Sequence, residues 1–413
     1  MNTPLDTDAD NFDVLIVGGG MVGASMACAL GKQNLSVGVI EAFPLRSHSQ
    51  PSYDARSIAL AYGSRRILEG LAIWDLFKSD ISAIKKIHIS DQGHFGVTRL
   101  DSQQVGVNAL GYVVENRVIG SALNEKLRQF ENIQLICPAK LIDLFINENF
   151  ASITIEQDQQ KRTLKSKLII AADGANSAVR KQLAIDCHHW EYGQTAIIST
   201  VSPRKPHHNI AYERFTSSGP VALLPLSENR CSLVLTVRDE NKEEILALND
   251  AQFLSHLEQR FGYRLGGFHK TAKRSAYPLT MMRAKEHIRK RVVFIGNAAH
   301  TVHPIAGQGF NLGIRDVSQL AETLILNHRA HKDLGCLGVL KQYEKRRKPD
   351  QIKVAAITDT LARIFSNEFA PLAHARSSGL FLADIIPPLK HQIARQAMGV
   401  TGRLPRLSRG LSI

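Results

Sequence analysis

Near the start of the chain, an apolar run is followed directly by a glycine cluster. Residues 12–17 read FDVLIV, glycines follow at 18–20 and 23, and small apolar residues continue in a helical pattern to about Gln33. A second apolar run, from Val37 to Glu41, comes next. A β-branched run, a glycine turn, a helix and another strand are typical of a βαβ unit. The pattern therefore predicts an α/β domain with a parallel sheet.

The middle of the chain alternates apolar and polar residues instead. Residues 141–171 contain the stretches LIDLFIN, ASITIEQ and KLIIAA, and this alternation predicts a small antiparallel meander. An uninterrupted apolar run returns at 292–295, followed by a glycine-rich loop and a long helix. The first domain is therefore expected to be interrupted in sequence by a second one. Further strand-like runs, which predict a larger antiparallel sheet in that second domain, lie at 194–201, 210–215, 219–226 and 231–237.

The last part of the chain is predicted to be helical. Beyond about residue 345 the helical pattern has breaks at Pro371 and at Pro387 and Pro388. The stretch 390–413 contains no acid, and its cations are Lys390, Arg395, Arg403, Arg406 and Arg409. Apolar residues spaced for one helical face lie at Leu389, Ile393, Ala397 and Val400. Two interpretations stay open: a helix packed on the protein with its basic face in solvent, or a contact with an anionic membrane surface or a partner protein.

Composition places the chain among ordinary globular proteins. Its 413 residues suffice for roughly two to three domains, and a hydrophobic content of 44% with 22% charged residues supports a sizeable core. The net charge of +13 permits an anionic partner, either a phosphate cofactor, nucleic acid or an acidic membrane. An aromatic content of 6% argues against an aromatic platform for single-stranded nucleic acid.

Cysteine usage and the first residues bear on the compartment. The five cysteines lie at least 44 positions apart, so no close pair suggests a zinc knuckle, a redox couple or a secreted disulfide framework. The chain begins MNTPLDTDAD, which is acidic where a signal peptide would be basic and apolar. No window approaches 18 uninterrupted apolar residues. We therefore expect a cytoplasmic protein that does not span a membrane.

The first glycine cluster has the spacing of a dinucleotide-binding turn. Gly18, Gly20 and Gly23 form GxGxxG directly after a strand and at the start of a helix, where backbone N–H groups can approach a pyrophosphate. Glu41 ends the next strand, and an acid there can hydrogen-bond a ribose diol. The strand, the helix and the acid together favour a dinucleotide over a purely structural turn. They do not separate NAD from FAD.

Two further clusters follow predicted strands. Residues 171–180, AADGANSAVR, match the pattern DGxxSxxR, and residues 296–311 read GNAAHTVHPIAGQGFN. The three clusters, in this order and spacing, resemble the FAD-dependent aromatic hydroxylases, or group A flavoprotein monooxygenases, over most of the chain. The strings DARSIAL at 54–60, SDQGHFG at 90–96 and GYVVEN at 111–116 narrow the resemblance to the hydroxylases of ubiquinone biosynthesis. The likeness is closest to those that act on 2-polyprenyl-6-methoxyphenol.

The resemblance implies an α/β fold like that of para-hydroxybenzoate hydroxylase. A Rossmann-like FAD-binding domain is interrupted by an antiparallel β-sheet substrate domain and followed by a helical C-terminal tail. The FAD-binding domain is expected in three parts, at 1–80, 111–185 and 279–345. The substrate domain is expected at 81–110 and 186–278, and the helical region at 346–413.

The resemblance also assigns cofactor-binding residues. Gly18, Gly20 and Gly23 are expected to hold the FAD pyrophosphate, and Glu41 the adenosine ribose. Arg56 is expected near the pyrophosphate or the flavin. In the segment after GYVVE, either Asn116 or Arg117 takes the place of the Arg or Gln that the family often has there.

The second and third clusters supply the remaining contacts. Asp173 and Gly174 are expected to contact FAD and to assist the reaction with NAD(P)H. Asn297 stands where most of the group has Asp, and its amide oxygen can also accept a bond from a ribityl hydroxyl. The loop that follows is expected to admit the flavin ring and to direct the positive end of a helix at it. The residues assigned to this loop and helix are Pro304, Gly307, Gln308, Gly309 and Asn311.

The reaction that the resemblance implies is a hydroxylation. NAD(P)H reduces FAD, and one atom of O2 is transferred to the ring of a polyprenyl phenol. Alternatives are a related hydroxylase for another ring position or a soluble aromatic, and a non-catalytic flavin-binding subunit of a biosynthetic complex. Other ubiquinone-biosynthesis proteins and the inner face of the membrane are further candidate partners, whereas nucleic acid is not expected.

No catalytic residue and no metal ligand can be assigned at this stage. His300 and His303 are three residues apart and could imitate a metal-binding pair. No further Cys, Asp or Glu accompanies them at a suitable spacing. We therefore expect no metal site.

Overall fold

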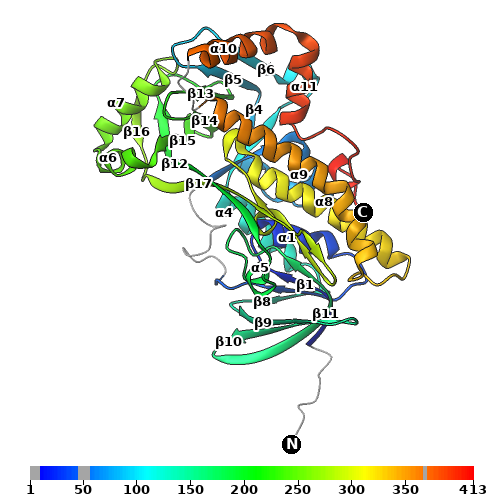
Figure 1. Cartoon of the computed structure of the whole chain (residues 1–413). Coiled ribbons are helices and arrows are strands. Elements are labelled where there is room, and N and C mark those ends of the chain that lie inside the picture. The colour runs from blue at the N-terminus through cyan, green and yellow to red at the C-terminus, as the bar shows by residue number, and fades with distance from the viewer. Residues whose placement is uncertain (1–9, 45–55, 366–369) are drawn as a thin grey trace, which may run out of the picture.

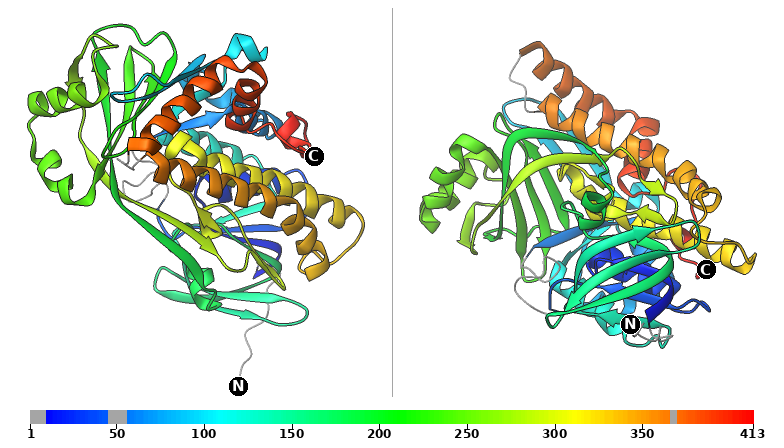
Figure 2. Two further views of the ribbon diagram at one scale, coloured as in Figure 1. Left: turned by 45° about the horizontal axis from the view of Figure 1, so that its top comes forward. Right: turned by 60° about the horizontal axis from the view of Figure 1, so that its bottom comes forward.

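A computed structural model describes residues 10–44, 56–365 and 370–413 of the chain. Within these residues the strands form a mixed sheet, a second, larger sheet and a small third sheet. Figures 1 and 2 show the mixed sheet toward one end of the molecule and the large sheet toward the other, with the long helices α8 (Gln308–Arg329) and α9 (Leu337–Phe365) between them. The predicted interruption of one domain by another is therefore present in the fold.

The mixed sheet contains the predicted βαβ unit. β1 (Asn11–Val17) pairs in parallel with β2 (Val37–Ile40), and α1 (Met21–Leu30) connects them. The helix ends three residues before Gln33, and a Cβ atom on Gly31 would lie 2.5 Å from the ring of Phe130. The strand order is β18-β19-β11-β1-β2-β8. The other strands on this path are β8 (Ile133–Ile136), β11 (Gln160–Ala171), β18 (Ile288–Arg289) and β19 (Val292–Phe294).

The predicted meander is also confirmed. β9 (Lys140–Ile146), β10 (Ala151–Gln157) and the first part of β11 pair antiparallel in that order. The second part of β11 continues into the mixed sheet, where it pairs in parallel with β1. Side chains of the meander and of α5 (Ala178–Gln182) cover one face of the mixed sheet. The opposite face packs on α1, α4 (Asn116–Leu127) and α8.

The large sheet has the order β20-β17-β12-β15-β14-β13-β5-β6, with β16 beside β12. The four predicted strand runs are present as β12 to β15, and β12 is longer than expected. The sheet is not wholly antiparallel, because β13 and β5 pair in parallel. β5 comes from the early segment 81–110, so no hairpin fixes its direction against β13. The strands are β5 (Lys86–Asp91), β6 (Val97–Asp101), β12 (Cys187–Pro203), β13 (Ile210–Phe215), β14 (Val221–Leu226), β15 (Arg230–Arg238), β16 (Phe268–Thr271), β17 (Ser275–Ala284) and β20 (His300–Thr301).

One face of the large sheet is covered by α6 (Lys242–Ala247) and α7 (Asp250–Phe261). α7 begins with a capping box in which Asn249 and Gln252 bond each other's backbone N–H groups. Its apolar residues Phe253, Leu257 and Phe261 are buried against the strands. The other face of the sheet is thereby left to meet the rest of the molecule.

A small third sheet was not predicted. β3 (Ser57–Ala61), β7 (Gly111–Glu115) and β4 (Ser82–Ile84) pair antiparallel with β7 in the centre. The short helices α2 (Tyr62–Gly70) and α3 (Ser102–Val105) follow strands β3 and β6. The β3–β7 pairing brings the described part of DARSIAL, from Ser57 on, beside GYVVE, although the two lie far apart in the sequence.

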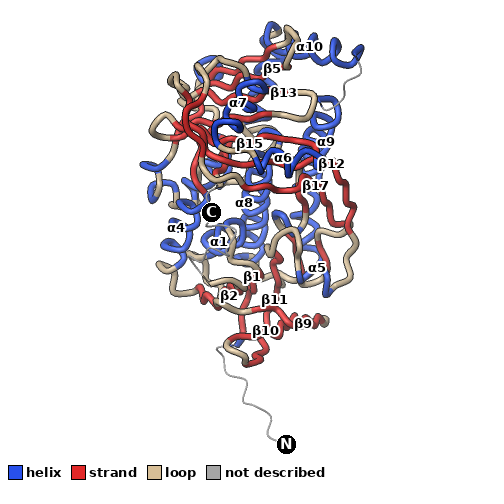
Figure 3. Tube along the Cα trace, turned by 90° about the vertical axis from the view of Figure 1, so that its left-hand side faces the viewer, coloured by secondary structure: helices blue, strands red, loops and turns tan. Residues whose placement is uncertain are grey.

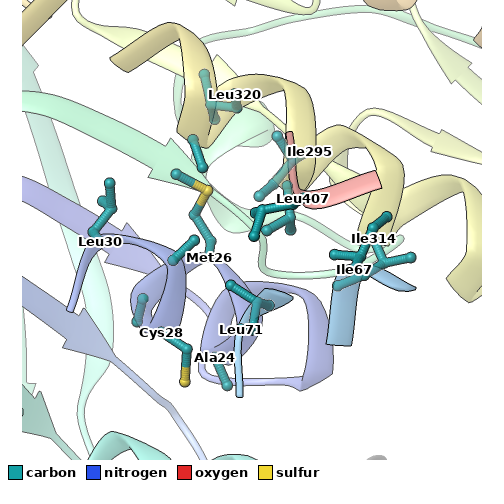
Figure 4. Packing of buried hydrophobic residues seen from close by; sticks show 14 of the residues in the cluster. Ala24, Met26, Cys28, Leu30, Ile67, Leu71, Ile295, Ile314, Leu320 and Leu407 are labelled. Atoms are coloured by element: carbon teal, nitrogen blue, oxygen red, sulfur yellow. The ribbon is translucent and has the colours of Figure 1, made fainter. Parts of the chain in front are cut away.

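The tail is helical, as expected. α9 continues through Pro349, α10 (Ala370–Ile385) has Pro371 near its first residue, and α11 (Pro387–Ala397) begins at the predicted proline pair. α11 packs through Ala394 and Met398 against Leu100 and Leu110. The short helix Leu407–Arg409 then returns to the main core, where Leu407 belongs to the same buried cluster as Met26, Ile67 and Leu320 (Figure 4). Within the described residues, no helix is both long and apolar enough to cross a membrane.

Candidate active site

Four neighbouring parallel strands of the mixed sheet end at one edge. In the order β19, β11, β1 and β2 they end at Phe294, Ala171, Val17 and Ile40. In open α/β sheets, ligands bind beyond the carboxyl ends of the strands. The residues that follow these four strands are those that the sequence singled out: Gly296 and Asn297, Asp173 and Gly174, Gly18 to Gly20, and Glu41. The fold therefore gathers the three motifs at one edge.

The first glycine turn is too closely packed for side chains. Gly18 has a φ of +101°, and a Cβ atom there would lie 2.5 Å from the carbonyl oxygen of Ala172. A Cβ atom on Gly23 would lie 1.9 Å from the carbonyl oxygen of Gly18. Gly20 caps the N-terminus of α1, where the first backbone N–H groups have no partner within the helix. These N–H groups make the turn suitable for an anion such as a pyrophosphate.

Glu41 lies beside this turn. Its buried carboxylate accepts hydrogen bonds from the backbone N–H of Gly19, at 2.7 Å, and of Phe43, at 2.9 Å. The acid is therefore held next to the glycine turn, where the ribose of a bound dinucleotide is found in folds of this kind. Its contact with the adenosine ribose remains a prediction.

The DGxxSxxR segment connects the second loop to the third. Ser177 caps α5, because its hydroxyl accepts a bond from the backbone N–H of Arg180 at 3.0 Å. The buried guanidinium of Arg180 donates to the carbonyl oxygens of Ala175 and Ala298, the latter at 2.8 Å. The Ser and the Arg of the motif thus have structural tasks that fix the loop geometry.

Asp173 keeps one carboxylate oxygen for another partner. Its Oδ2 accepts a bond from the backbone N–H of Val179 at 3.1 Å, whereas its buried Oδ1 has no hydrogen-bond partner among the residues described. Burial raises the pKa of Asp173, against the opposing effect of bonds from Ser177 and the backbone. Gly174 beside it has a φ of +81° and open space where a Cβ atom would stand. An unpartnered oxygen beside open space fits a donor group of a ligand.

The third loop is a short turn held by buried charge. Asn297 is exposed between the buried residues Gly296 and Ala298. The backbone N–H of Gly296 donates to the carboxylate of Asp316 on α8 at 3.1 Å. The same carboxylate accepts a bond from Nε2 of His300 at 2.7 Å. His300, which resembled half of a metal pair, is therefore a partner of Asp316.

Asp316 also binds α9. Arg347 Nε and Gln351 Nε2 donate to its Oδ1 at 2.8 and 2.9 Å. Burial by itself would raise the pKa of Asp316, but the facing His300 and Arg347 side chains hold it well below its usual value. The ionised carboxylate is fully buried and fully bonded, so it fixes the third loop to two helices.

The loop between Pro304 and Gly309 lies against β3. Gly307 has a φ of +59°, and a Cβ atom there would lie 3.1 Å from that of Ala59. Gly309 has open space where a Cβ atom would stand. α8 begins at Gln308, three residues earlier than the helix start expected near Asn311. The glycines therefore leave room beside a helix N-terminus. A flat ring system would fit this room, and the partial positive charge of the helix N-terminus would favour a negative charge on the ring.

Asn311 has a different task from the one expected. Its side-chain oxygen accepts bonds from Ala61 N at 2.8 Å and Ser64 Oγ at 2.7 Å. Its side-chain nitrogen donates to the carbonyl oxygens of Ala59 and Gly307, both at 2.7 Å. These four bonds use the hydrogen-bonding capacity of an amide. The Asn311 side chain therefore holds the loop against β3 and is committed to the protein instead of a ligand.

Arg56 and Asn116 lie together at the ends of the paired strands β3 and β7. The backbone N–H of Asn116 donates to the carbonyl oxygen of Arg56 at 2.8 Å, and Asn116 is buried. The guanidinium of Arg56 lies 4.8 Å from the ring centre of Tyr277. Arg117 instead pairs with Glu115 at 2.6 Å, with a side chain that is 62% exposed. Of the two candidates after GYVVE, Asn116 is therefore the one buried beside Arg56.

Glu213 on β13 was not among the residues singled out from the sequence. Ala211 and Phe215 of this strand pack toward the small sheet and the loop 304–309, through Val113 and Ile305 respectively. Alternate residues of a strand share a face, so Glu213 lies on that same face. Burial, its only resolved cause, raises the pKa of Glu213 to about 7. An acid at an alternate position between two apolar residues of a predicted strand was the available signal.

The sequence analysis considered His303 only as half of a possible metal pair. It is 1% exposed, and its Nδ1 accepts a bond from the backbone N–H of Ile305 at 3.3 Å. Its Nε2 has no partner among the described residues. Burial lowers the pKa of His303 to about 4, so the ring is neutral at pH 7 and Nε2 carries its proton. A buried, unpartnered donor beside the loop is available to a ligand.

Tyr192 and Asp359 stand next to this histidine. The rings of Tyr192 and His303 meet edge to face, with their centres 4.8 Å apart. The Tyr192 hydroxyl donates to the Asp359 carboxylate at 2.9 Å. Burial and this bond both raise the pKa of Tyr192, so its hydroxyl remains protonated. Strand β12, the loop and helix α9 therefore meet at one place.

An apolar cluster lies next to these polar residues. We call it the loop cluster, and it consists of Phe215, Ile305, Ala362 and Phe365 with the partly buried Ile89, Tyr192, Leu361, Ile364 and Leu380. The rings of Phe215 and Phe365 are stacked with their centres 3.5 Å apart. The residues beside the loop therefore suit an aromatic or aliphatic substrate group.

The fold and the site together define a flavoprotein monooxygenase. The profile of the FAD binding domain family matches residues 11–358. Among solved structures, p-nitrophenol 4-monooxygenase PnpA from Pseudomonas putida DLL-E4 matches with a TM-score of 0.79 at 20% identity, over 95% of this chain and 99% of that one. PqsL from Pseudomonas aeruginosa matches with a TM-score of 0.74 at 22% identity, over 90% and 99%. At these identities the structures show the fold.

Curated relatives define the family more narrowly. The ubiquinone hydroxylase UbiL of Rhodospirillum rubrum is 38% identical, over 99% of this chain and 96% of its own. The 3-demethoxyubiquinol 3-hydroxylase of Escherichia coli is 33% identical, over 94% and 98%. The human mitochondrial ubiquinone biosynthesis monooxygenase COQ6 is 31% identical, over 92% and 91%. The chain belongs to the FAD-dependent monooxygenases of ubiquinone biosynthesis, with FAD as cofactor and NAD(P)H as co-substrate.

Proposed function

We propose that this enzyme hydroxylates the ring of a polyprenyl phenol, and that 2-polyprenyl-6-methoxyphenol is its substrate. The observation that carries the proposal is the composition of the loop cluster. The donor His303 contacts Tyr192 and Ile305 of this mostly apolar cluster, and the acid Glu213 lies on the same sheet face as Phe215 of the cluster. A phenol bearing an aliphatic chain has the matching parts, namely one hydroxyl on an otherwise apolar body.

FAD would bind at the carboxyl edge of the mixed sheet in this proposal. Gly18, Gly20 and Gly23 would hold its pyrophosphate and Glu41 its ribose, and Arg56 and Asn116 would supply further contacts. Bound FAD supplies the electron transfer and the oxygen chemistry. The remaining contacts are assigned to Asp173, Gly174, Asn297 and the loop residues Pro304, Gly307, Gln308 and Gly309.

The protein's own residues position the phenol and move its proton. The neutral Nε2–H of His303 donates a hydrogen bond to the phenol oxygen. The Glu213 carboxylate accepts the phenol proton, which makes the ring more electron-rich toward an electrophilic oxygen. In the complete reaction NAD(P)H gives up two electrons, one atom of O2 enters the ring, and the other leaves as water.

The relatives differ in what their names say they hydroxylate, so the ring position requires a direct test. The FAD-loaded enzyme is incubated with NAD(P)H, 2-polyprenyl-6-methoxyphenol and ¹⁸O2, and the product is analysed by mass spectrometry. We expect one labelled oxygen atom in the product and oxidation of NAD(P)H that depends on the phenol. Label from water, or an enzyme that accepts only other ring patterns, would contradict the proposed substrate.

A pair of variants connects this activity to the site. Glu213→Gln is expected to slow hydroxylation by about 100-fold, the usual lower range for loss of a general base. Glu156→Gln, on the exposed surface of β10, is the matched control and should behave as the parent does. Both variants should retain the flavin absorption spectrum.

A further inference from the structure

The helices α10 and α11, the residue that joins them and the loop between β5 and β6 carry exposed apolar side chains. We call this surface the apolar ridge, and it consists of Phe95, Phe381, Leu382, Ile385, Ile386 and Leu389. Their exposed fractions run from 38% for Leu389 to 65% for Phe95. Single exposed apolar residues are ordinary, but a run of them on one surface marks an interaction site. We therefore infer that the ridge is covered by another molecule when the protein functions.

The ridge is a continuous surface. The rings of Phe95 and Phe381 meet edge to face at 5.9 Å. Leu382 and Ile386 are joined by a helical hydrogen bond, and Lys390 N bonds the carbonyl of Ile386 in the next turn. Within α10, helical spacing places Leu382 next to Ile385. The backbone is extended at Ile386, so the chain changes direction there before α11 begins. Figures 1 and 3 show α10 at the end of the molecule opposite β9 and β10.

α10 is held firmly, so the exposure of its outer side is a property of the fold. Its inner side follows the edge strand β6. The Ser377 hydroxyl accepts a bond from Gly96 N at 2.8 Å, and Thr98 Oγ1 donates to Leu380 O at 2.7 Å. A Cβ atom on Gly96 would lie 2.3 Å from the carbonyl oxygen of Ser377. These contacts cover the sheet edge and fix which side of α10 faces outward.

Cations border the ridge. Asp384 is the acid of α10, and it is paired with both Arg99 and Lys390, the latter at 2.9 Å. From α11 to the end of the chain the sequence contains cations and no acid. Arg395 and Arg403 in this stretch are exposed. Exposed apolar side chains followed by a stretch of chain that has exposed cations and no acid are complementary to a bilayer with anionic headgroups.

The ridge also continues inward to the candidate active site. Leu380, the neighbour of Phe381, packs on the loop cluster, whose member Ile305 belongs to the loop 304–309. Apolar side chains therefore lie in succession from the outer surface of α10 to the residues beside the phenol site. An aliphatic chain leaving a bilayer would meet apolar contacts along this direction.

We propose that the apolar ridge docks onto the surface of an anionic lipid bilayer and directs the end of the molecule that carries α10 toward the substrate. This inference rests on the proposed function, because a polyprenyl phenol resides in lipid. It assigns the apolar contact to α10 and α11, and leaves to the basic residues beyond them an electrostatic contribution that salt screens.

The test measures co-sedimentation of FAD-loaded protein with vesicles of phosphatidylglycerol and phosphatidylcholine in equal parts. The parent should bind, and less so at high salt. The double variant Leu382→Ser/Ile385→Ser should bind about tenfold or more weakly, because two exposed side chains lose their burial in lipid. The matched control is Phe145→Ser/Tyr263→Ser, which removes two large side chains that are more exposed than Leu382 and Ile385 and lie elsewhere, and it should bind as the parent does.

A second variant reports the contact directly. Leu382→Trp should shift its fluorescence emission to shorter wavelengths when anionic vesicles are added. Binding of the double variant equal to that of the parent, or no shift for the tryptophan, would overturn the proposal. A parent dimer that the double variant dissociates would also overturn it, because a second copy would then cover the ridge.

Activity on a short-chain water-soluble phenol separates this inference from the proposed function. The double variant should hydroxylate that phenol at the parental rate, since the ridge is not part of the loop cluster. Vesicle binding by a parent that hydroxylates no phenol would contradict the proposed function and leave the docking surface intact. Hydroxylation by a parent that does not bind vesicles would contradict the docking surface and leave the proposed function intact.

Discussion

Glu213 is an ionisable residue on a strand face that it shares with the apolar residues Ala211 and Phe215. Burial raises the pKa of Glu213 to about 7, so the carboxylate needed to accept a phenol proton forms as the pH rises through neutrality. We predict that the hydroxylation rate of the parent rises between about pH 6 and 8, following this ionisation. Glu213→Gln should lose that rise as well as most of its activity. The measurement is a pH–rate profile under saturating NAD(P)H.

Stability provides an independent check on the same residue. In the unfolded chain an acid of ordinary pKa loses its proton near pH 4.3, whereas folded Glu213 retains its proton to about 7. The folded protein therefore binds more protons in this interval, and the free energy of unfolding contributed by Glu213 falls as the pH rises through it. Glu213→Gln should be more stable than the parent at pH 8, with the advantage shrinking at pH 4. An advantage that does not change with pH would contradict a raised pKa.

A substitution at Gly309 would probe the space beside the loop 304–309. A side chain at this position meets open space in the protein, so Gly309→Leu should fold with near-parental stability. The added side chain would occupy the room expected for the flavin, and FAD affinity should fall by at least about tenfold. Gly338→Leu is a matched control, because Gly338 also lies in the first turn of a helix and its Cβ position meets only ordinary contacts. Titration with FAD, followed by fluorescence quenching, measures both.

At the scale of elements, Asp316 is the point where the third loop, α8 and α9 are joined. Asp316→Asn would remove one of the two carboxylates that pair with the buried Arg347, the other being that of Asp350 at 2.6 Å. We therefore expect a loss of about 3 kcal/mol in the free energy of unfolding at pH 7, the lower end of the range for a broken buried ion pair. Because the pKa of Asp316 is depressed in the folded state, its stabilisation is present above the unfolded pKa and is lost as the pH falls below it. The gap between parent and variant should therefore narrow in acid.

The control for this prediction is an exposed ion pair. Asp186 pairs with Lys285 at 3.0 Å, and its side chain is 75% exposed. Asp186→Asn should change the free energy of unfolding by no more than about 1 kcal/mol. Urea unfolding of both variants compares them. Equal losses would show that burial of the Asp316 network contributes nothing beyond an ordinary surface pair.

The elements that the sequence predicts are those with a local cause. The glycine turn, the meander and strands β12 to β15 follow from alternation and motif spacing within short windows. The parallel pairing of Lys86 with Ile210 and the small sheet of β3, β4 and β7 depend on contacts between distant segments. No local pattern encodes such a pairing. The same distinction holds for the site. Gly18 was predicted from a motif, whereas Glu213 was identified only from the structure, which shows that its face of the large sheet is turned toward the loop 304–309.

Asn311 shows how a motif residue can be located correctly and still have another task. The string that contains it marks the loop, and the structure places it there. Its four side-chain bonds, to β3, α2 and the loop itself, are all within the protein. A sequence motif records that a residue type is needed at a position. Only the packing shows whether the need comes from a ligand or from the fold.

For the whole molecule, the end of the chain returns to the first domain. The hydroxyls of Ser318 and Ser408 lie 2.9 Å apart, and the backbone N–H of Arg406 donates to Glu322 at 3.0 Å. A guanidinium from α2, that of Arg66, donates to the carbonyl oxygen of Arg409. The basic tail therefore has a structural attachment of its own, apart from any contact with lipid. α8 receives this tail on one side and the mixed sheet on the other.

Leu407 is the side chain through which the tail enters the core. It is 1% exposed and belongs to the cluster that contains Ile67, Leu71 and Ile314. Leu407→Ala should lower the free energy of unfolding by about 2–5 kcal/mol, since it removes buried methyl groups and leaves a cavity. Leu411→Ala, in the same tail but 45% exposed, should change it by no more than about 0.5 kcal/mol. Vesicle binding should be unaffected in both variants, because neither residue belongs to the apolar ridge. If the two variants were equally stable in urea, the tail would not be part of the cooperative fold.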